Sequence, residues 1–424
     1  MGLVEDRPPH RANFLAIHQG RAHADDVAAH HSAEKECNLP VIEEIAAFAG
    51  DLTAIRRDLH EHPELGFEEV RTAGIVAEKL RGWGIEVTTG IGKTGVVGVL
   101  KGTGPGRTIG LRADMDALPI HEQTNLPWAS KVPGVMHACG HDGHTTMLLG
   151  AARYLSENPD FAGTVVFIFQ PAEEGLGGAR AMIADGLFDR FPCDEIYGMH
   201  NAPTGQPGQV GVKKGPAMAG ANFFDVRITG RGSHGARPEG SRDPIIISTT
   251  LVQQIQSIVS RNVAPTKPAV VSVTKIQSGA AYNVIPNAAE FGGTVRFFDT
   301  EVGDLISGRI RALCAGAAQA YEVEIDVDIR NVFDVLVNDA SLSDAILEAA
   351  APVVGDARAS LKHDLVMGSE DFADMLRVVP GAYCTVGHCG DVQLHNPGYV
   401  LDDDILPVGA SIYVNVAMAR GAAS

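Results

Sequence analysis

The chain has 424 residues, a length that predicts two or three domains rather than one core. Its 45% hydrophobic and 20% charged residues are typical of a soluble globular protein and argue against a disordered one. A formal net charge of −18 with no offsetting basic patch argues against a nucleic acid or an anionic membrane as partner.

The cysteines and the apolar runs indicate the compartment. Six cysteines without a Cys-x-x-Cys pair are too sparse for a disulfide scaffold. No run of eighteen apolar residues is present, and the N-terminus has no apolar signal core. We therefore expect a cytoplasmic protein with reduced thiols and no membrane partner.

Residues 1–40 contain five histidines but little apolar periodicity, and we expect a disordered extension rather than a metal-scavenging tail. From Val41, apolar residues recur at steps of three and four and predict helical structure that ends before Pro63. A further helix is expected over 72–83. Short apolar runs then predict strands at 96–100, 108–114, 165–170, 196–200 and 382–386. Such strands, separated by helices, predict an α/β fold with a mixed, largely parallel sheet covered on both faces.

The pattern changes between 217 and 331. There it predicts, in order, strand 223–229, helix 243–262, strands 269–277 and 289–298, helix 301–320 and strand 322–329. This β-α-β-β-α-β order is that of a ferredoxin-like α+β domain. We therefore predict one domain made of 41–216 and 332–424, with a second domain inserted at 217–331.

The stretch from His137 to His144 is the densest group of metal-binding side chains. It places one thiol, three imidazoles and a carboxylate within eight residues. Cys139 and His141 are two apart, so in an extended loop both can point the same way. A thiolate with an imidazole suits zinc or a similar divalent metal. The alternative is a polar loop whose histidines cap a helix, but the density of donors favours a metal site.

Other polar residues follow the ends of the predicted strands, where ligands gather in open α/β sheets. They are Asp114, Asp116, Glu173, Glu174 and His200. Of two adjacent carboxylates, one can bind metal while the other takes a proton from water. A solvated acidic turn is the alternative interpretation of Glu173-Glu174. No Gly-x-Ser-x-Gly elbow indicates a serine hydrolase.

Eight motifs in order make the chain resemble a known family. They are Arg112-Ala-Asp-Met-Asp-Ala-Leu-Pro119, His137-Ala-Cys-Gly-His-Asp-Gly-His144, Gln170-Pro-Ala-Glu-Glu-Gly175, Gly232-Ser-His-Gly235, Asn283-Val-Ile-Pro286, Gly293-Thr-Val-Arg296, Met367-Gly-Ser-Glu-Asp-Phe372 and His395-Asn-Pro397. The chain resembles the dinuclear metallopeptidases that include aminoacylases and carboxypeptidases, in the branch of hippurate hydrolase and the indoleacetyl-amino-acid hydrolases. The resemblance covers about residues 50 to 415.

The resemblance implies a role for each matching residue. Two divalent ions (zinc, manganese, cobalt or nickel) would be held by Cys139, His141, Glu174, His200 and His395. Glu173 would be the general base, and His234 would stabilise the oxyanion, in many relatives from the partner subunit. Asn283 and Arg296 would bind the carbonyl and the free carboxylate of the substrate. Asp114 and His144 would not bind the metals themselves but would orient the side chains that do.

The sequence departs from the family at two points. Arg112 stands where other branches have a histidine ligand, and Cys139 is expected to compensate. Glu239 follows Pro238 where the family usually has histidine, which can alter packing near His234.

The implied activity is a metal-dependent amidohydrolase that cleaves an N-acyl or N-aroyl amino acid into a carboxylic acid and a free amino acid. The inserted domain would then be a lid and a dimerisation domain, giving a homodimer or a higher homo-oligomer. The alternatives are a dipeptidase, a carboxypeptidase or an amidase for a related small amide, and a catalytically silent protein that binds acyl amino acids.

Overall fold

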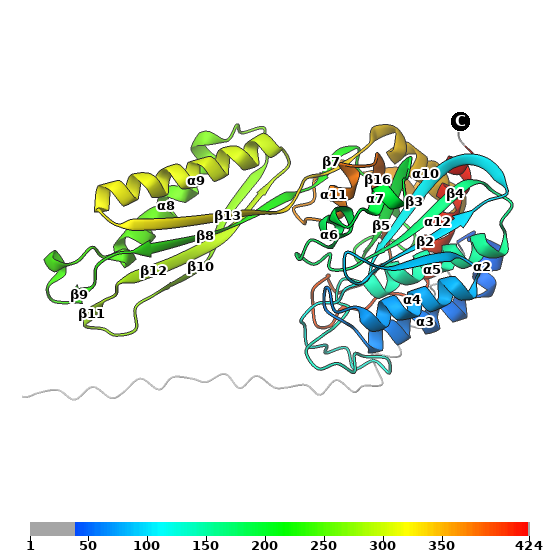
Figure 1. Cartoon of the computed structure of the whole chain (residues 1–424), viewed down its shortest axis with the longest axis horizontal. Helices are drawn as coiled ribbons and strands as arrows, with labels where there is room; N and C mark the ends of the chain where they lie inside the picture. The colour runs from blue at the N-terminus through cyan, green and yellow to red at the C-terminus, as the bar shows by residue number, and fades with distance from the viewer. Residues whose placement is uncertain (1–38, 423–424) are drawn as a thin grey trace, which may run out of the picture. The chain divides into compact units, whose positions relative to one another are not determined.

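The computed structural model describes residues 39–422 (Figure 1). The predicted disordered extension at 1–40 therefore lies outside the described residues, except for Leu39 and Pro40. Leu39 packs against the main hydrophobic core. Among the described residues, no helix has both the length and the apolar character that crossing a membrane requires.

The helical segment that begins after Val41 consists of two helices rather than one continuous helix. They are α2 (Glu43–Ala47) and α3 (Ala49–Glu61), and α4 (Val70–Gly82) follows. The break falls at Phe48, whose φ of −111° and ψ of 19° lie outside the helical range. Its ring is buried, and Gly50 next to it is a weak helix former. As predicted, α3 ends just before His62-Pro63.

The main sheet has eight strands in the order β1-β2-β4-β3-β5-β16-β6-β15. Their bounds are β1 Glu86–Ile91, β2 Gly95–Lys101, β3 Gly104–Asp114, β4 Ala162–Gln170, β5 Glu195–Ala202, β6 Val210–Val212, β15 Ala359–Leu361 and β16 Gly381–Gly387. The central strands β4, β3, β5 and β16 are parallel, whereas β1, β2 and β6 run antiparallel to a neighbour. All five predicted runs are strands, and the predicted mixed, largely parallel sheet is confirmed.

Helices cover both faces of this sheet, because successive strand residues point to opposite sides and both sets are apolar. The larger core holds one face against α3, α4, α5 (His141–Glu157), α10 (Ala340–Val354) and α12 (Ile405–Gly421). A smaller core holds the other face against α6 (Gly178–Ala184), α7 (Leu187–Arg190) and α11 (Phe372–Leu376). Helix α5 is buried along most of its length, so the loop that precedes it has a rigid base.

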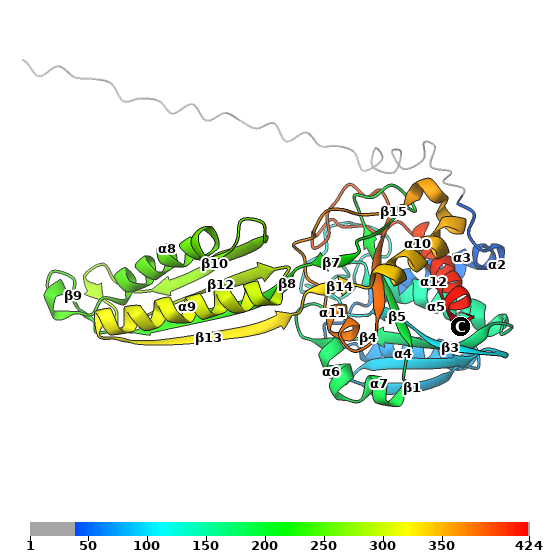
Figure 2. The same ribbon diagram turned by 90° about the horizontal axis from the view of Figure 1, so that it is seen from above.

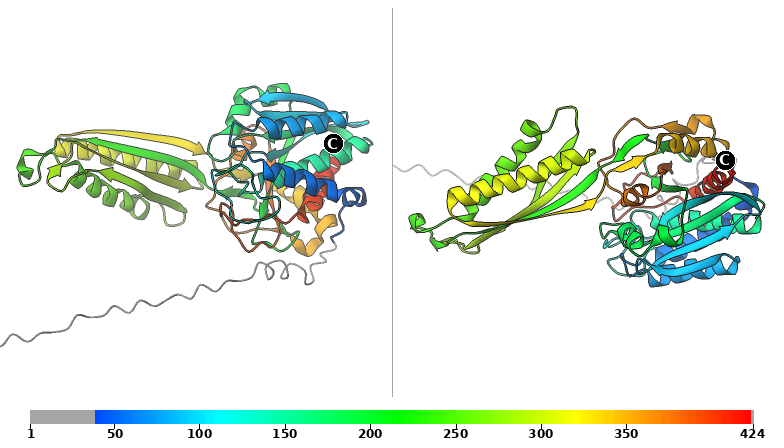
Figure 3. Two further views of the ribbon diagram at one scale, coloured as in Figure 1. Left: turned by 90° about the horizontal axis from the view of Figure 1, so that it is seen from below. Right: turned by 45° about the horizontal axis from the view of Figure 1, so that its top comes forward.

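The inserted segment forms a separate antiparallel sheet in the order β10-β12-β8-β13. Its elements are β8 Gly220–Thr229, α8 Pro244–Asn262, β10 Ala269–Ser278, β12 Ala288–Phe297, α9 Thr300–Tyr321 and β13 Glu324–Phe333. Both helices pack on one face of the sheet (Figures 2 and 3), and each begins at an aspartate whose carboxylate accepts a backbone N–H. The predicted ferredoxin-like order is therefore present. Two short pairs complete the fold: β7 (Gly215–Met218) with β14 (Leu336–Asn338), and β9 (Ser233–His234) with β11 (Val284–Ile285).

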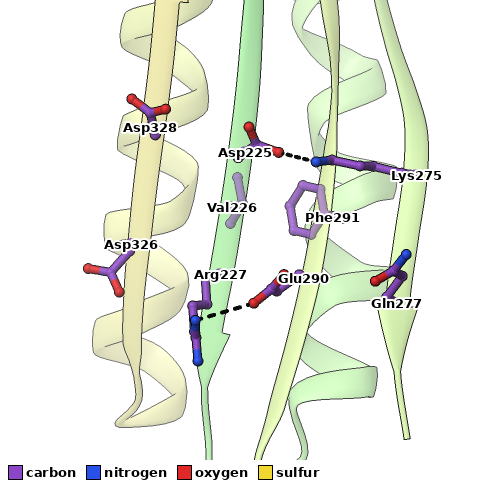
Figure 4. Close-up of a pocket in the computed structure, with 9 residues that line it drawn as sticks. All are labelled: Asp225, Val226, Arg227, Lys275, Gln277, Glu290, Phe291, Asp326 and Asp328. Carbon is purple, nitrogen blue, oxygen red and sulfur yellow. Dashed lines mark ion pairs between the residues drawn. The ribbon is translucent and has the colours of Figure 1, made fainter.

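The face of the inserted sheet that carries no helix is covered with paired charges (Figure 4). Asp225 contacts Lys275 at 2.5 Å and Arg330 at 2.6 Å, and Arg227 contacts Glu290 at 3.4 Å. Exposed pairs of this kind contribute roughly 0–1 kcal/mol each. The hollow between them is lined mostly by charged side chains, so this face is a solvated surface.

A buried ion-pair chain ties α3 to the beginning of α5. Nδ1 of His60 lies 2.8 Å from Oδ2 of Asp142, and Nη1 of Arg56 lies 3.5 Å from the same oxygen. Burial alone would lower the pKa of His60, but the Asp142 carboxylate outweighs it and raises the pKa from 6.5 to about 9. The protonated imidazole therefore stabilises the folded state.

We predict that this stabilisation disappears at alkaline pH. It is fully present below pH 6.5 and is lost as the pH rises through about 9, because the folded protein then releases the proton that it had held more tightly than the unfolded chain. Its size is up to about 3 kcal/mol. The Tm of wild type should exceed that of a His60→Gln variant at pH 6, and the difference should shrink toward pH 9.5. The same substitution at exposed His121 is the control, and a pH-independent difference for His60→Gln would contradict the prediction.

Candidate metal centre

The Cys139 loop is held in place by a glycine at the start of α5. Gly140 has a φ of 85°, and a Cβ at this position would lie 2.4 Å from Nδ2 of Asn201. That amide nitrogen donates to the carbonyl oxygen of Cys139 at 2.6 Å. Because Asn201 lies on β5, this bond fixes the loop against the carboxyl end of a central strand, where open α/β sheets bind ligands.

The five predicted metal ligands converge at this end of the sheet. Sγ of Cys139 lies 3.3 Å from Nε2 of His200, and Nε2 of His395 lies 3.3 Å from Oε1 of Glu174. Nε2 of His141 is 4.0 Å from the same Glu174 oxygen. The donors form two overlapping groups that share the thiol: Cys139, His141 and His200, and Cys139, Glu174 and His395.

The donor atoms fit divalent metal ions. Nε2 of His141 and Oε1 of Glu174 are both buried without a hydrogen-bond partner. A buried polar atom left unpaired costs roughly 1–3 kcal/mol, so a cation between these atoms would remove the penalty. Burial also raises the pKa of the Cys139 thiol, so a bound cation is needed to hold it as a thiolate. Thiolate, imidazole and carboxylate together are a donor set for zinc and similar ions.

Asp116 orients two of these donors. Its Oδ1 lies 3.2 Å from Nδ1 of His141, which leaves Nε2 of that ring facing the centre. Its Oδ2 accepts the backbone N–H of Glu174 at 3.0 Å. The sequence placed Asp116 at a strand end but gave it no role. The available signal was its position two residues after Asp114, in the same motif.

His144 and Asp114 lie just behind the donors. Nδ1 of His144 is 2.6 Å from Oδ1 of Asp114, and Nε2 accepts the backbone N–H of Asn201 at 3.0 Å. Both ring nitrogens of His144 are thus engaged with protein groups, an arrangement suited to support rather than to metal ligation. The other Asp114 oxygen accepts from Nη1 of Arg112 at 2.8 Å.

Arg112 is the centre of a buried network. Besides Asp114, its fully buried guanidinium donates to Oε1 of Gln170 at 2.9 Å and to Oε1 of Glu370 at 2.9 Å. Asp371 accepts from it at 3.2 Å. The guanidinium neutralises carboxylates beneath the centre. The sequence contained Glu370 and Asp371 in a family motif, but nothing in their spacing indicated that they surround Arg112.

Glu173 is almost fully buried beside this network, with 6% of its surface exposed. Its Oε1 accepts the backbone N–H of Asp371 at 3.4 Å. Burial raises the pKa of Glu173 well above its ordinary value, and the nearby carboxylates of Glu370, Asp371 and Glu174 raise it further. A carboxylate in this environment accepts a proton readily, as a general base must.

The donors open onto a cavity of about 520 Å³, within the size range of small-molecule sites. Glu173 lines it, and Arg296 and Phe333 reach it from the inserted domain. Nη1 of Arg296 donates to Oγ of Ser369 at 2.5 Å. Within residues 39–422, no carboxylate lies at ion-pair distance from this guanidinium, and burial lowers its pKa. An unpaired, half-buried guanidinium in a cavity suits an anionic ligand.

His234 and Asn283 do not line this cavity. His234 lies on β9 and Asn283 directly precedes β11, and the N–H of Gly235 donates to the carbonyl of Asn283 at 2.7 Å. The strand register places this pair at the end of the inserted sheet opposite Gly220 and Phe333, where the chain enters and leaves the domain. His234 is exposed there. A single chain thus assembles the predicted metal ligands, Glu173 and Arg296, but not His234 or Asn283.

A parallel α/β sheet with a centre of thiol, imidazole and carboxylate donors, a buried carboxylate and an inserted α+β domain defines a class of metal-dependent hydrolases. Residues 110–419 match the model of peptidase family M20/M25/M40, and the chain belongs to this family. The resemblance found in the sequence is thereby confirmed.

Individual relatives cover nearly the whole chain. Hippurate hydrolase from Campylobacter jejuni is 46% identical over 89% of this chain and 98% of its own length. N-acetylcysteine deacetylase from Bacillus subtilis is 40% identical over 88% of this chain and 97% of its own. The crystal structure of a dinuclear metal-binding peptidase of the M20 family from Bacillus subtilis has a TM-score of 0.76 at 37% identity, covering 88% of this chain and 98% of that one.

Proposed function

We propose that this protein is a metal-dependent amidohydrolase that releases a free amino acid from an N-acyl or N-aroyl amino acid. The observation that carries the proposal is one cavity lined by four of the five convergent metal donors, by a buried carboxylate at Glu173 and by an unpaired guanidinium at Arg296; the fifth donor, His141, is fully buried next to Cys139 and His200. The similarity to hippurate hydrolase and to N-acetylcysteine deacetylase supports the same substrate class.

Two divalent ions, zinc, manganese, cobalt or nickel, would be held by the five donors. These donors are Cys139, His141, Glu174, His200 and His395. When bound, such ions polarise the scissile carbonyl and provide a water nucleophile near neutral pH.

Glu173 moves the proton in this reaction. Its carboxylate takes a proton from the attacking water as the oxygen bonds to the carbonyl carbon, and it later delivers that proton to the amide nitrogen as the C–N bond breaks. The buried setting excludes bulk water from the carboxylate. The products are a carboxylic acid and an amine, and the atoms of one water are divided between them.

The test of the reaction is a substrate panel. The enzyme should hydrolyse hippurate and N-acetylcysteine. It should lose this turnover after a chelator removes the metals and should regain it when metal is restored. Dipeptides with a free amino group should be poorer substrates. Turnover that survives complete metal removal would overturn the proposal, and a preference for dipeptides would favour a dipeptidase.

Arg296 would bind the free carboxylate of the substrate. Arg296→Ala should lower kcat/KM for hippurate about 10- to 100-fold, the effect of losing a hydrogen bond to a charged group, and should affect hippuramide, which has no carboxylate, much less. Arg227→Ala, on the solvated face of the inserted sheet, is the matched control. Equal losses on both substrates would remove Arg296 from this role.

We also infer a homodimer formed through the inserted domain. Exposed apolar side chains gather at the start of α8, the end of β10 and β11; they are Ile245, Ile246, Ile276, Tyr282 and Val284. A partner covering this surface would let the exposed His234 and the adjacent Asn283 serve the cavity of the other subunit. The double variant Ile246→Asp/Tyr282→Asp should be monomeric by light scattering and strongly impaired in turnover. A fully active monomer would contradict the inference.

We also propose a cytoplasmic location. The described cysteines are all free, and Cys139 must stay reduced to act as a ligand.

A further inference from the structure

Lys362 is a further cation of the cavity that has no acidic partner, beside Arg296 and Lys213. Carboxylates outnumber Lys and Arg in this protein by 52 to 34. A basic side chain in a concave site would therefore ordinarily form an ion pair with a carboxylate. Lys362 and Arg296 both line the cavity. Among residues 39–422, neither has a carboxylate within ion-pair distance.

The position of Lys362 is fixed by its surroundings. It directly follows β15, and its backbone N–H donates to the carbonyl of Val212 at 2.7 Å. Its aliphatic stem crosses Gly211 so closely that a Cβ on that glycine would lie 2.0 Å from Cε of the lysine. Glycine at this position leaves this path open. The stem is thus directed across β6 toward the neighbouring strand β16.

The ammonium group reaches a position next to the metal donors. Nζ of Lys362 donates to Oγ1 of Thr385. Thr385 on β16 is in register with His200 on the adjacent parallel strand β5. Arg296 is held elsewhere, by Ser369, so the two cations are anchored to different parts of the cavity wall.

The nearby charges leave Lys362 available to a ligand. Lys213 and Asp364 line the same cavity, but Asp364 forms no ion pair with Lys362 within the described part of the chain. The side chain of Lys362 is exposed; desolvation lowers its pKa, and the Cys384 thiol raises it. An ammonium group without a counter-charge is stabilised by an anion.

We propose that Lys362 binds a carboxylate on the acyl portion of the substrate, so that the preferred substrates are amino acids acylated by a dicarboxylic acid. This rests on the proposed function, in which Arg296 takes the carboxylate of the amino acid. Lys362 is then left for the other part of the molecule, beyond the scissile amide. The geometry thus assigns Lys362 to substrate specificity rather than to the bond-breaking step.

The test compares substrates that differ only in charge. N-succinylglycine is paired with its terminal amide, N-succinamoylglycine, and the ratio of their kcat/KM values is measured in metal-loaded enzyme. Lys362→Met keeps the aliphatic stem and removes the charge, and it should lower this ratio about 10- to 100-fold. The matched control is Lys214→Met, because Lys214 pairs with Asp344 at 2.6 Å and does not line the cavity. It should leave the ratio within about twofold, as expected for an exposed ion pair.

A second pair locates the carboxylate. N-acetylaspartate and N-acetylasparagine place the charge difference on the amino acid, so Lys362→Met should leave their ratio unchanged. A drop confined to this pair would overturn the assignment to the acyl portion. An unchanged ratio for the succinyl pair would overturn the role of Lys362 altogether.

Binding supplies a readout that does not depend on turnover. Succinate should raise the Tm of wild type more than succinamate does, and Lys362→Met should remove that difference. Equal shifts in the two proteins would contradict the proposal even if no N-acyl amino acid were hydrolysed. Loss of all hydrolysis with the succinate difference intact would refute the proposed function alone.

Discussion

Replacement of Glu173 by glutamine is expected to lower kcat by about 10²- to 10⁴-fold, the usual contribution of a general base, while the metals remain bound. The reason is geometric and electrostatic. The Glu173 side chain is buried beside the donors and lies close to His141 and Glu174, but it is not one of the five predicted ligands and belongs to neither group that shares the Cys139 thiol. Glutamine keeps its size and its hydrogen bond from the Asp371 backbone but cannot accept a proton from water.

The measurement combines single-turnover kinetics on hippurate with metal analysis of the same sample. The control is Glu68→Gln, the same change at an exposed glutamate outside the cavity. A Glu173→Gln enzyme with near-normal kcat would show that another group moves the proton. Loss of metal together with activity would show that Glu173 is itself a ligand.

The Cys139→Ser variant is expected to lose both metal affinity and activity. Cys139 is the one side chain common to the two donor groups that contain the five predicted ligands. Its removal therefore weakens the binding of both ions. Loss of a residue that only supports a ligand typically costs 10- to 100-fold in metal affinity, so loss of the shared donor should cost more than about 100-fold. Serine preserves the shape but is a poor anionic ligand near neutral pH.

The readout is the number of metal ions per chain after dialysis against a weak chelator, together with turnover. Cys389→Ser changes an exposed free thiol outside both groups and should match wild type. A Cys139→Ser protein that retains two ions and full activity would contradict the assignment of the shared donor.

The sequence predicted the fold well because the main strands are apolar on both faces. A continuous apolar run such as 165–170 has few alternatives once helices flank it on both sides. The break at Phe48 was missed because helical periodicity continues across it. Periodicity reports which side chains face the core and does not detect a change in backbone direction.

The metal donors were predictable for a similar reason. Cys139 and His141 are close in sequence. Glu174 follows β4, and His200 lies near the carboxyl end of β5; these two strand ends are at one edge of the sheet. The network under Glu173 was not predictable, because Arg112 and Glu370 are 258 residues apart and only tertiary packing brings them together. The place of Lys362 in the cavity was not predicted, because its side chain passes over Gly211, which lies on another strand.

The position of His234 could not be predicted from its motif. The resemblance implies a catalytic role for it, yet it lies on β9, away from the cavity of its own chain. A sequence motif does not give the tertiary position of its residues.

The most direct measurement is anomalous X-ray diffraction from crystals of active, metal-loaded enzyme, with elemental analysis of the same preparation. It should show two ions per chain, each within bonding distance of donors drawn from Cys139, His141, Glu174, His200 and His395. Fully active enzyme that contains no divalent metal, or ions bound away from these side chains, would contradict the proposed metal centre.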